Sequence, residues 1–237
     1  MMCCDWRFFT LLSISTVSFG ALASSFEASR RLSSPYHSAN ANTLLNSFDF
    51  SSHLEWDKFY EDNPCWFEWH DSVPLERIAS HIPHNSDCLM VGCGNSMLPA
   101  VTLFSRTSTR INLLDTSPKC IEQLKEFYGS ALEYTLGDAT RLTTLFPPDK
   151  RFDIIVDKGL TDAILCGEGF DTFLERLYQE ASQVLRCKSG LYLLISYRLS
   201  KSNKDFLTEI GDSVEMDWEF DLPDSNDRVS VSMARKR

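Results

Sequence analysis

The 237-residue sequence is poor in positive charge, with 23 Lys and Arg against 33 Asp and Glu and a net charge of -10 at pH 7. A protein that binds a nucleic-acid backbone needs cationic side chains to displace counterions, so this balance argues against nucleic acid as a partner. The charge is compatible with a basic protein as partner. It also has a simpler explanation, because an excess of one charge keeps a protein soluble.

Metal-ligand spacings are also missing, since the eight cysteines form no CxxC pair. The spacing argues against a zinc site, and we expect no bound metal. Cys88, Cys93 and Cys187 lie in or beside apolar runs, where a free thiol behaves as a small hydrophobe. We therefore expect reduced cysteines, although two of them could still be neighbours in space.

The apolar stretch at residues 8–23 (FFTLLSISTVSFGALA) is short for a transmembrane helix, and we expect no stable membrane insertion. It follows Arg7 and ends in small residues, as the core and cleavage site of a secretory signal peptide do. Residues 24–46 are rich in Ser and Ala and include Arg30 and Arg31, a composition typical of organellar transit peptides.

These features predict a targeting or disordered segment over residues 1–47 and one domain over residues 48–237. The expected location is a plastid or mitochondrion, or a compartment of the secretory pathway, reached through a cleavable amino-terminal segment. A cytoplasmic protein with a disordered tail is the alternative.

The rest of the chain alternates between strand and helix patterns. Residues 117–129 predict a helix that opens at Ser117 and Pro118 and closes near Gly129. Residues 170–186 predict a second helix, whose apolar stripe comprises Phe173, Leu174, Leu177, Ala181, Val184 and Leu185. Buried strands are predicted at 88–91, 111–115, 132–138, 152–159 and 190–196, and a closing hairpin at 214–222 and 228–236. The pattern indicates an α/β fold whose sheet is mostly parallel with a carboxy-terminal antiparallel hairpin.

A ligand site is predicted where four of these strands end. In parallel sheets ligands bind at the carboxyl ends of the strands, and these ends fall at Gly92, Asp115, Asp138 and Asp157. The Gly92-Cys93-Gly94 turn predicts close approach of a nucleotide-like ligand. Met97 stands where a dinucleotide-binding turn has its third glycine, and no lysine of a P-loop follows.

Four stretches carry a family resemblance: 56–69 (WDKFYEDNPCWFEW), 91–96 (VGCGNS), 137–140 (GDAT) and 157–164 (DKGLTDAI). They resemble class I S-adenosylmethionine-dependent methyltransferases, and among these the protein-lysine methyltransferases that act on elongation factor 1A or citrate synthase. Two positions depart from the family pattern, the order Leu160-Thr161 and His70 in place of an aromatic residue. Both departures fall on the substrate side.

The resemblance implies a Rossmann-like sheet and S-adenosylmethionine as cofactor. It implies that the turn formed by Gly92, Cys93, Gly94 and Asn95 approaches the methionine part of the cofactor. Asp115 would accept the ribose hydroxyls. Asp138 would contact the adenine amino group, with Ala139 lining the ring. Asp157 is expected to contact substrate or cofactor, with a helix N-cap as the alternative.

The chemistry of methyl transfer indicates a site that positions two reactants and accepts a deprotonated amine. Glu68 and Trp69, with Phe67, are predicted to form an aromatic and acidic wall opposite Asp157 and Lys158. Core packing of an amino-terminal helix is the alternative explanation. The expected function is methylation of an exposed lysine on a protein, elongation factor 1A-like or organellar. A small-molecule methyltransferase and a non-catalytic binding module are alternatives, and the sequence does not indicate an oligomeric state.

Overall fold

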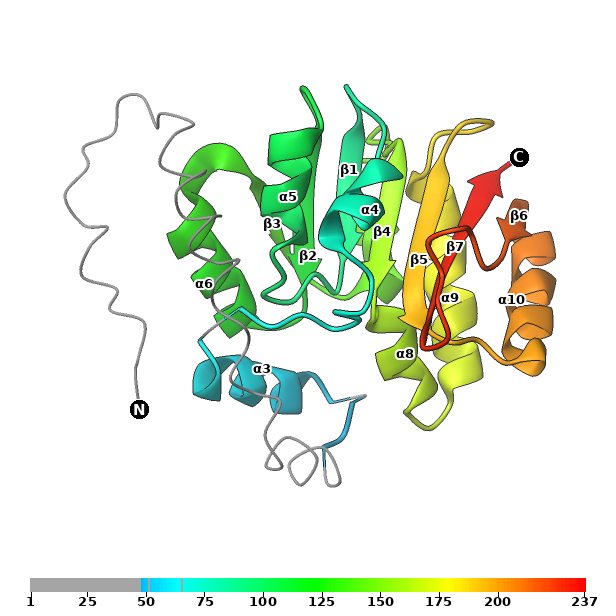
Figure 1. Cartoon of the computed structure of the whole chain (residues 1–237), viewed down its shortest axis with the longest axis horizontal. Coiled ribbons are helices and arrows are strands. Elements are labelled where there is room, and N and C mark those ends of the chain that lie inside the picture. Colours follow the sequence, from blue (N-terminus) through cyan, green and yellow to red (C-terminus); the bar gives the residue numbers. More distant parts are fainter. Residues whose placement is uncertain (1–47, 51, 65) are drawn as a thin grey trace. The chain divides into compact units, whose positions relative to one another are not determined.

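The computed structural model describes residues 48–50, 52–64 and 66–237, and the compact unit within them comprises Asp49–Arg237 (Figure 1). The predicted targeting segment, residues 1–47, lies outside the described residues. Among the helices that are described, none combines the length and the apolar character needed to cross a bilayer.

One seven-stranded sheet organises this unit, with the strand order β3-β2-β1-β4-β5-β7-β6. Five strands are parallel: β1 (Asp87–Val91), β2 (Arg110–Asp115), β3 (Glu133–Leu136), β4 (Ile154–Lys158) and β5 (Leu191–Tyr197). The other two are antiparallel, β6 (Met216–Glu219) and β7 (Val229–Lys236), and β7 lies between β5 and β6. The predicted fold class is therefore confirmed. The strand order reverses between β1 and β4, which is where such sheets bind ligands.

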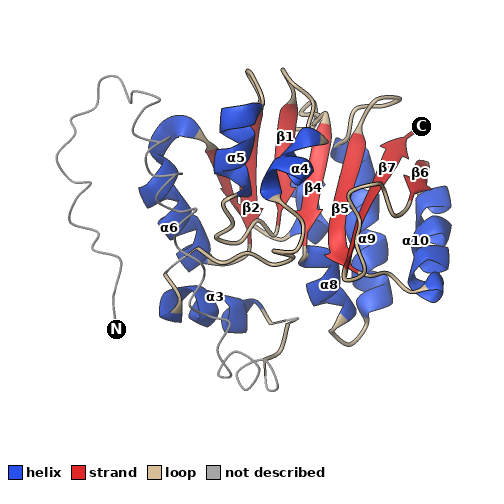
Figure 2. Ribbon diagram, in the orientation of Figure 1, coloured by secondary structure: helices blue, strands red, loops and turns tan. Residues whose placement is uncertain are grey.

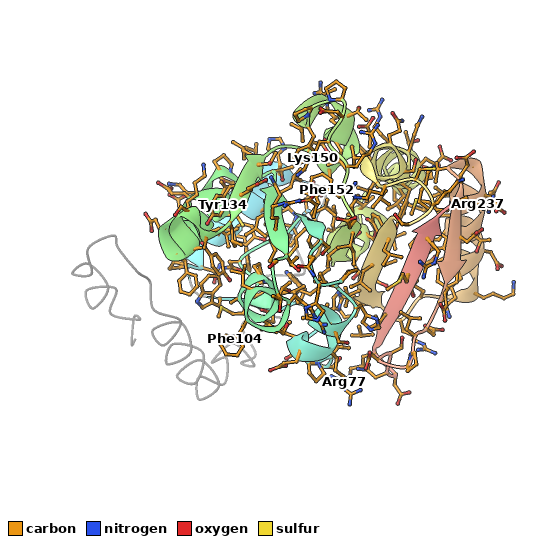
Figure 3. All side chains as sticks on the ribbon, turned by 90° about the horizontal axis from the view of Figure 1, so that it is seen from above. Arg77, Phe104, Tyr134, Lys150, Phe152 and Arg237 are labelled. Carbon is orange, nitrogen blue, oxygen red and sulfur yellow. The ribbon has the colours of Figure 1, made fainter. Side chains whose placement is uncertain are left out.

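Helices cover both faces of the sheet (Figure 2). In the view from above, Arg77 of α4 and Phe104 of α5 lie on one side, and Phe152, which packs in the core with α9, lies on the other (Figure 3). The α-helices in the described part are α3 (His53–Asp62), α4 (Leu75–Ser80), α5 (Leu98–Ser105), α6 (Pro118–Tyr128), α7 (Leu142–Leu145), α8 (Leu160–Leu165), α9 (Phe170–Val184) and α10 (Lys201–Ser213).

Both predicted helices are present. The hydroxyl of Ser117 accepts a hydrogen bond from the Cys120 amide at the start of α6, and Gly129, with φ 55°, ends this helix. The predicted stripe of α9 is buried except at Phe173, which is 49% exposed, so this part of the prediction was wrong. Phe173 lies at the edge of the buried face of α9, since the next residue, Leu174, is fully buried and Phe173 points about 100° away from it.

Candidate active site

A cleft lies at the carboxyl edge of the parallel strands, with a free volume of about 70 Å³. Its walls come from α3 and the segment after it, from the turns after β1 and β2, and from the start of α8. Eight residues that the sequence assigned to the site line this cleft: Phe67, Trp69, Gly92, Cys93, Gly94, Asn95, Asp115 and Lys158. Figure 1 shows α3 and α8 at this edge of the sheet.

The glycine turn owes its composition to backbone geometry and to close packing. Gly92 and Gly94 both have φ +53°, a conformation that side chains disfavour. A Cβ atom on Gly92 would lie 3.0 Å from Cβ of Leu160, and one on Gly94 would lie 2.9 Å from the hydroxyl of Tyr60. The groups that approach this backbone are thus side chains of α8 and α3. A ligand over the turn stays a prediction.

Asp115 forms a fixed acidic group in the cleft. One carboxylate oxygen accepts from the Gly94 amide at 3.0 Å and the other from the Ser117 amide at 2.9 Å. Burial raises the pKa of this carboxyl, and the two amides oppose that rise by stabilising its charge. Its position beside the glycine turn suits an acceptor for ligand hydroxyl groups.

Opposite the glycine turn stands an aromatic wall, which we define as Trp56, Tyr60, Phe67 and Trp69. Trp69 meets Trp56 edge-on at 6.0 Å and Phe67 edge-on at 5.0 Å, measured between ring centroids. Trp56 stacks on Tyr60 at 6.1 Å. The rings of this segment pack on one another, as the alternative explanation held, and they also line the cleft. Contact with an acceptor amine stays a prediction.

The aromatic wall is tied to α6 through α3. The carboxylate of Asp57 accepts from the Ser117 hydroxyl at 2.6 Å and from the Lys119 amide at 2.9 Å. Burial raises the pKa of Asp57, but these hydrogen bonds outweigh it and lower the pKa overall. Gln123 donates to the Tyr60 carbonyl at 2.6 Å. Sequence reasoning missed these contacts, since no local pattern marks either side chain as a partner for α3.

Glu68 does not line the cleft. Its carboxylate accepts from the Ser96 hydroxyl at 2.8 Å and from the Met97 amide just before α5, and it pairs with Lys158 at 3.0 Å. The Lys158 ammonium also donates to the Trp69 carbonyl at 2.9 Å. Glu68 therefore links the aromatic wall to the glycine turn and to β4. The sequence had predicted that its carboxylate faces the substrate.

Asp157 also lies outside the cleft lining, and this corrects its expected contact with substrate or cofactor. Its fully buried carboxylate accepts from the Leu160 amide at 2.9 Å, the Thr161 hydroxyl at 2.6 Å and the Tyr192 hydroxyl at 2.9 Å. Burial raises the pKa of Asp157 to about 6. The alternative role, capping the first turn of α8, is the one that the structure supports.

Asp138 and Ala139 are absent from the cleft lining as well. The Asp138 carboxylate accepts from the amide of Thr140 at 2.8 Å and opens a short 3-10 helix, while Ala139 packs in the core with α9. The Gly137 amide donates to the Asp115 carbonyl at 3.0 Å, so Asp138, which follows β3, lies near the end of β2. Contact of these residues with an adenine ring stays a prediction.

The strand order and the parallel register are those of a Rossmann-like fold, and solved S-adenosylmethionine-dependent methyltransferases share this fold. Human N-acetylserotonin methyltransferase in complex with SAM superposes with a TM-score of 0.57 at 14% sequence identity, covering 92% of this chain and 66% of that chain. No family model matches the sequence.

Among such methyltransferases the sequence is similar to protein-lysine methyltransferases, which confirms the predicted resemblance. The mouse eEF1A lysine and N-terminal methyltransferase is 30% identical over 195 residues, which are 80% of this chain and 28% of the mouse protein. The zebrafish mitochondrial citrate synthase-lysine N-methyltransferase is 28% identical over 166 residues, 60% of this chain and 65% of that protein. The chain thus spans less than a third of the mouse relative.

Proposed function

We propose that the chain transfers the methyl group of S-adenosylmethionine to the side chain of a lysine in a protein. One observation carries the proposal: the cleft sets the glycine turn and Asp115 against an aromatic wall. The relatives named for lysine methylation support the same assignment.

On the cofactor side, the methionine part would lie along the turn from Gly92 to Asn95, and Asp115 would accept the ribose hydroxyls. Asp138 and Ala139 are proposed to reach the adenine ring. Pockets for ligands of this size have volumes of about 300 Å³ or more, well above the free volume of about 70 Å³ in this cleft. The cofactor would therefore displace part of the aromatic wall as it enters.

On the acceptor side, Trp69 and Phe67 would hold the aliphatic stem and the amine of the lysine. Aromatic faces attract a cationic amine by about 0.5–1 kcal/mol at exposed sites. The amine must be neutral when it attacks, and transfer from water to an aromatic surface favours the neutral form. The transfer itself is an in-line displacement, so the protein contributes mainly position and exclusion of water.

Residues 1–47 are proposed to be an address for a plastid, a mitochondrion or the secretory pathway. The proposal is supported by their composition, rich in Ser and Ala with Arg30 and Arg31. Terminal sequencing of the native protein should find a first residue between Ser24 and Ser47. A first residue of Met1 or Met2 would refute cleavage.

The proposed function is tested by incubating the full chain with methyl-labelled S-adenosylmethionine and a cell extract. We expect label on a protein band, and mass spectrometry should locate it on a lysine ε-amine. Label on an α-amine would move the assignment to N-terminal methylation, and label in a small-molecule fraction would move it to the small-molecule class. Absence of any label, with normal folding, would favour a binding module.

A further inference from the structure

Three potential metal ligands converge beside the glycine turn: Cys93, Asp115 and Cys120. Their two sulfur atoms and a carboxylate oxygen all lie within 4.8 Å of one another. Both cysteines are free thiols. Among the described residues, no other group of three His, Cys, Asp or Glu side chains lies close enough to share an ion.

We propose that Cys93, Asp115 and Cys120 form a binding site for a thiophilic divalent cation such as Zn²⁺. Zinc takes thiolate sulfur at about 2.3 Å and carboxylate oxygen at about 2.0 Å, so ligand atoms of a tetrahedral site lie roughly 3.5–3.8 Å apart. Closing the observed group around an ion therefore needs movements of about 1 Å, within reach of side-chain rotation. Cys93 lines the cleft, so the fourth position opens toward the cleft and takes a water molecule.

The protons and charges of this binding step balance. A cysteine thiol has an ordinary pKa of about 8.5, so it carries its proton at pH 7. Both thiols are therefore protonated before binding. Binding breaks two S–H bonds, forms two metal–sulfur bonds and releases two protons to solvent, while Asp115 supplies its carboxylate. The cation neutralises the thiolates as they form. The positive end of the helix dipole further favours a thiolate at Cys120, which lies in the first turn of α6.

The site overlaps the proposed cofactor site, because Asp115 belongs to both. The cation and S-adenosylmethionine should then exclude one another. This overlap rests on the proposed function, whereas the cation site itself does not.

Cd²⁺ is the probe for the cation site, since thiolate–cadmium bonds absorb in the ultraviolet. In a titration of the full chain, one equivalent of Cd²⁺ should bind at this site. The variants Cys93→Ser and Cys120→Ser should each bind that equivalent roughly 100-fold more weakly. Cys187→Ser, which alters an exposed thiol, is the matched control and should retain that equivalent. Calorimetry in two buffers with different ionisation enthalpies should count two protons released for this equivalent.

Equal binding by wild type, Cys93→Ser and Cys120→Ser would overturn the cation site. Because Cys120 is fully buried, circular dichroism of each variant shows whether it folds, and Cys93→Ala serves as a second variant that leaves the buried thiol in place. Saturating S-adenosylhomocysteine should weaken binding of Cd²⁺ at this site at least about tenfold. If S-adenosylhomocysteine binds but does not weaken the binding of Cd²⁺, the overlap of the two sites is wrong and the cation site stands. If it does not bind at all, the proposed function fails separately.

Discussion

Asp115 and Asp157 occupy equivalent places in the sheet but have different surroundings. Each lies at the carboxyl end of a parallel strand, Asp115 in β2 and Asp157 in β4, and burial raises the pKa of each carboxyl. Asp115 lines the cleft and is held by two backbone amides. Asp157 is enclosed in the core by the Thr161 and Tyr192 hydroxyls and the first amides of α8.

The difference comes from the residue two positions further along the chain. Ser117 precedes α6 and caps that helix with its own hydroxyl, so Asp115 is not drawn into its first turn. Gly159 precedes α8 and has no side chain to cap with, so the Asp157 carboxylate accepts those amides instead. An acid at a strand end is therefore available to a ligand only where another residue caps the helix that follows.

The largest expected effect is that of Asp157→Ala. It leaves the Tyr192 hydroxyl and the first-turn amides of α8 without their acceptor in the core, at a cost of about 1–3 kcal/mol for each unsatisfied group. We expect the free energy of unfolding, measured by urea denaturation, to fall by about 3–5 kcal/mol. Cofactor affinity of the folded fraction should stay within about threefold of wild type. A loss of stability under about 1 kcal/mol would contradict the capping role.

Asp115→Asn should act in the opposite way, on ligand binding more than on stability. The amide oxygen can still accept one backbone hydrogen bond, but the charged acceptor for the ribose hydroxyls is lost, worth about 1.5–3 kcal/mol. We expect calorimetry to show S-adenosylmethionine binding weakened roughly ten- to a hundredfold. The free energy of unfolding should fall by only about 1 kcal/mol, for the one amide hydrogen bond that is lost. Unchanged affinity would remove Asp115 from the cofactor site.

Glu68 and Trp69 extend the comparison to the acceptor side. Trp69→Ala removes a ring that lines the cleft, and we expect kcat/KM for the acceptor protein to fall about five- to tenfold. Glu68→Ala should lower kcat/KM as well, because it releases Lys158 and the start of α5, and it should also cost stability. Cofactor affinity, the control, should fall less than kcat/KM for the acceptor protein in both variants. Equal loss of cofactor binding in both would contradict the acceptor role.

The smallest effect is a difference in pH dependence. The folded-state pKa of Asp157 is about 6, above its ordinary value of 3.8, so the folded protein holds this proton more tightly than the unfolded chain. The resulting stability is fully present below pH 3.8 and is lost as pH rises through about 6. From about pH 5 to about pH 7 the wild type should lose about 1 kcal/mol from this group, and Asp157→Asn should not. If the free energies of unfolding of wild type and Asp157→Asn change in parallel across this pH range, the assignment of this pH dependence to Asp157 is refuted.

Much of the fold could be predicted because its signals are local. The strands are short apolar runs, and α6 is marked by Ser117, Pro118 and Gly129 within one short stretch. The helix α10 was missed, since its buried positions, Leu207, Ile210 and Gly211, form only a brief apolar pattern among polar residues.

The part of the candidate site that follows from the order and direction of the strands could be predicted from the sequence. Carboxyl ends of parallel strands meet at one edge, which brought Gly92, Gly94 and Asp115 together as expected. Contacts that depend on side-chain direction were not predictable. The contact of Glu68 with Ser96 and the meeting of Cys93 with Cys120 join residues far apart in sequence, and no spacing rule marks them.

The position of β7 has a consequence for how the chain folds as it is synthesised. The five parallel strands can pair once residue 197 has left the ribosome, but β5 keeps an open edge until residues 229–236 follow and insert beside it. An unpaired edge is a template for strands of other chains. Translation that stalls between these two points would therefore leave a nascent chain prone to aggregate, and chaperone protection is needed most in that interval.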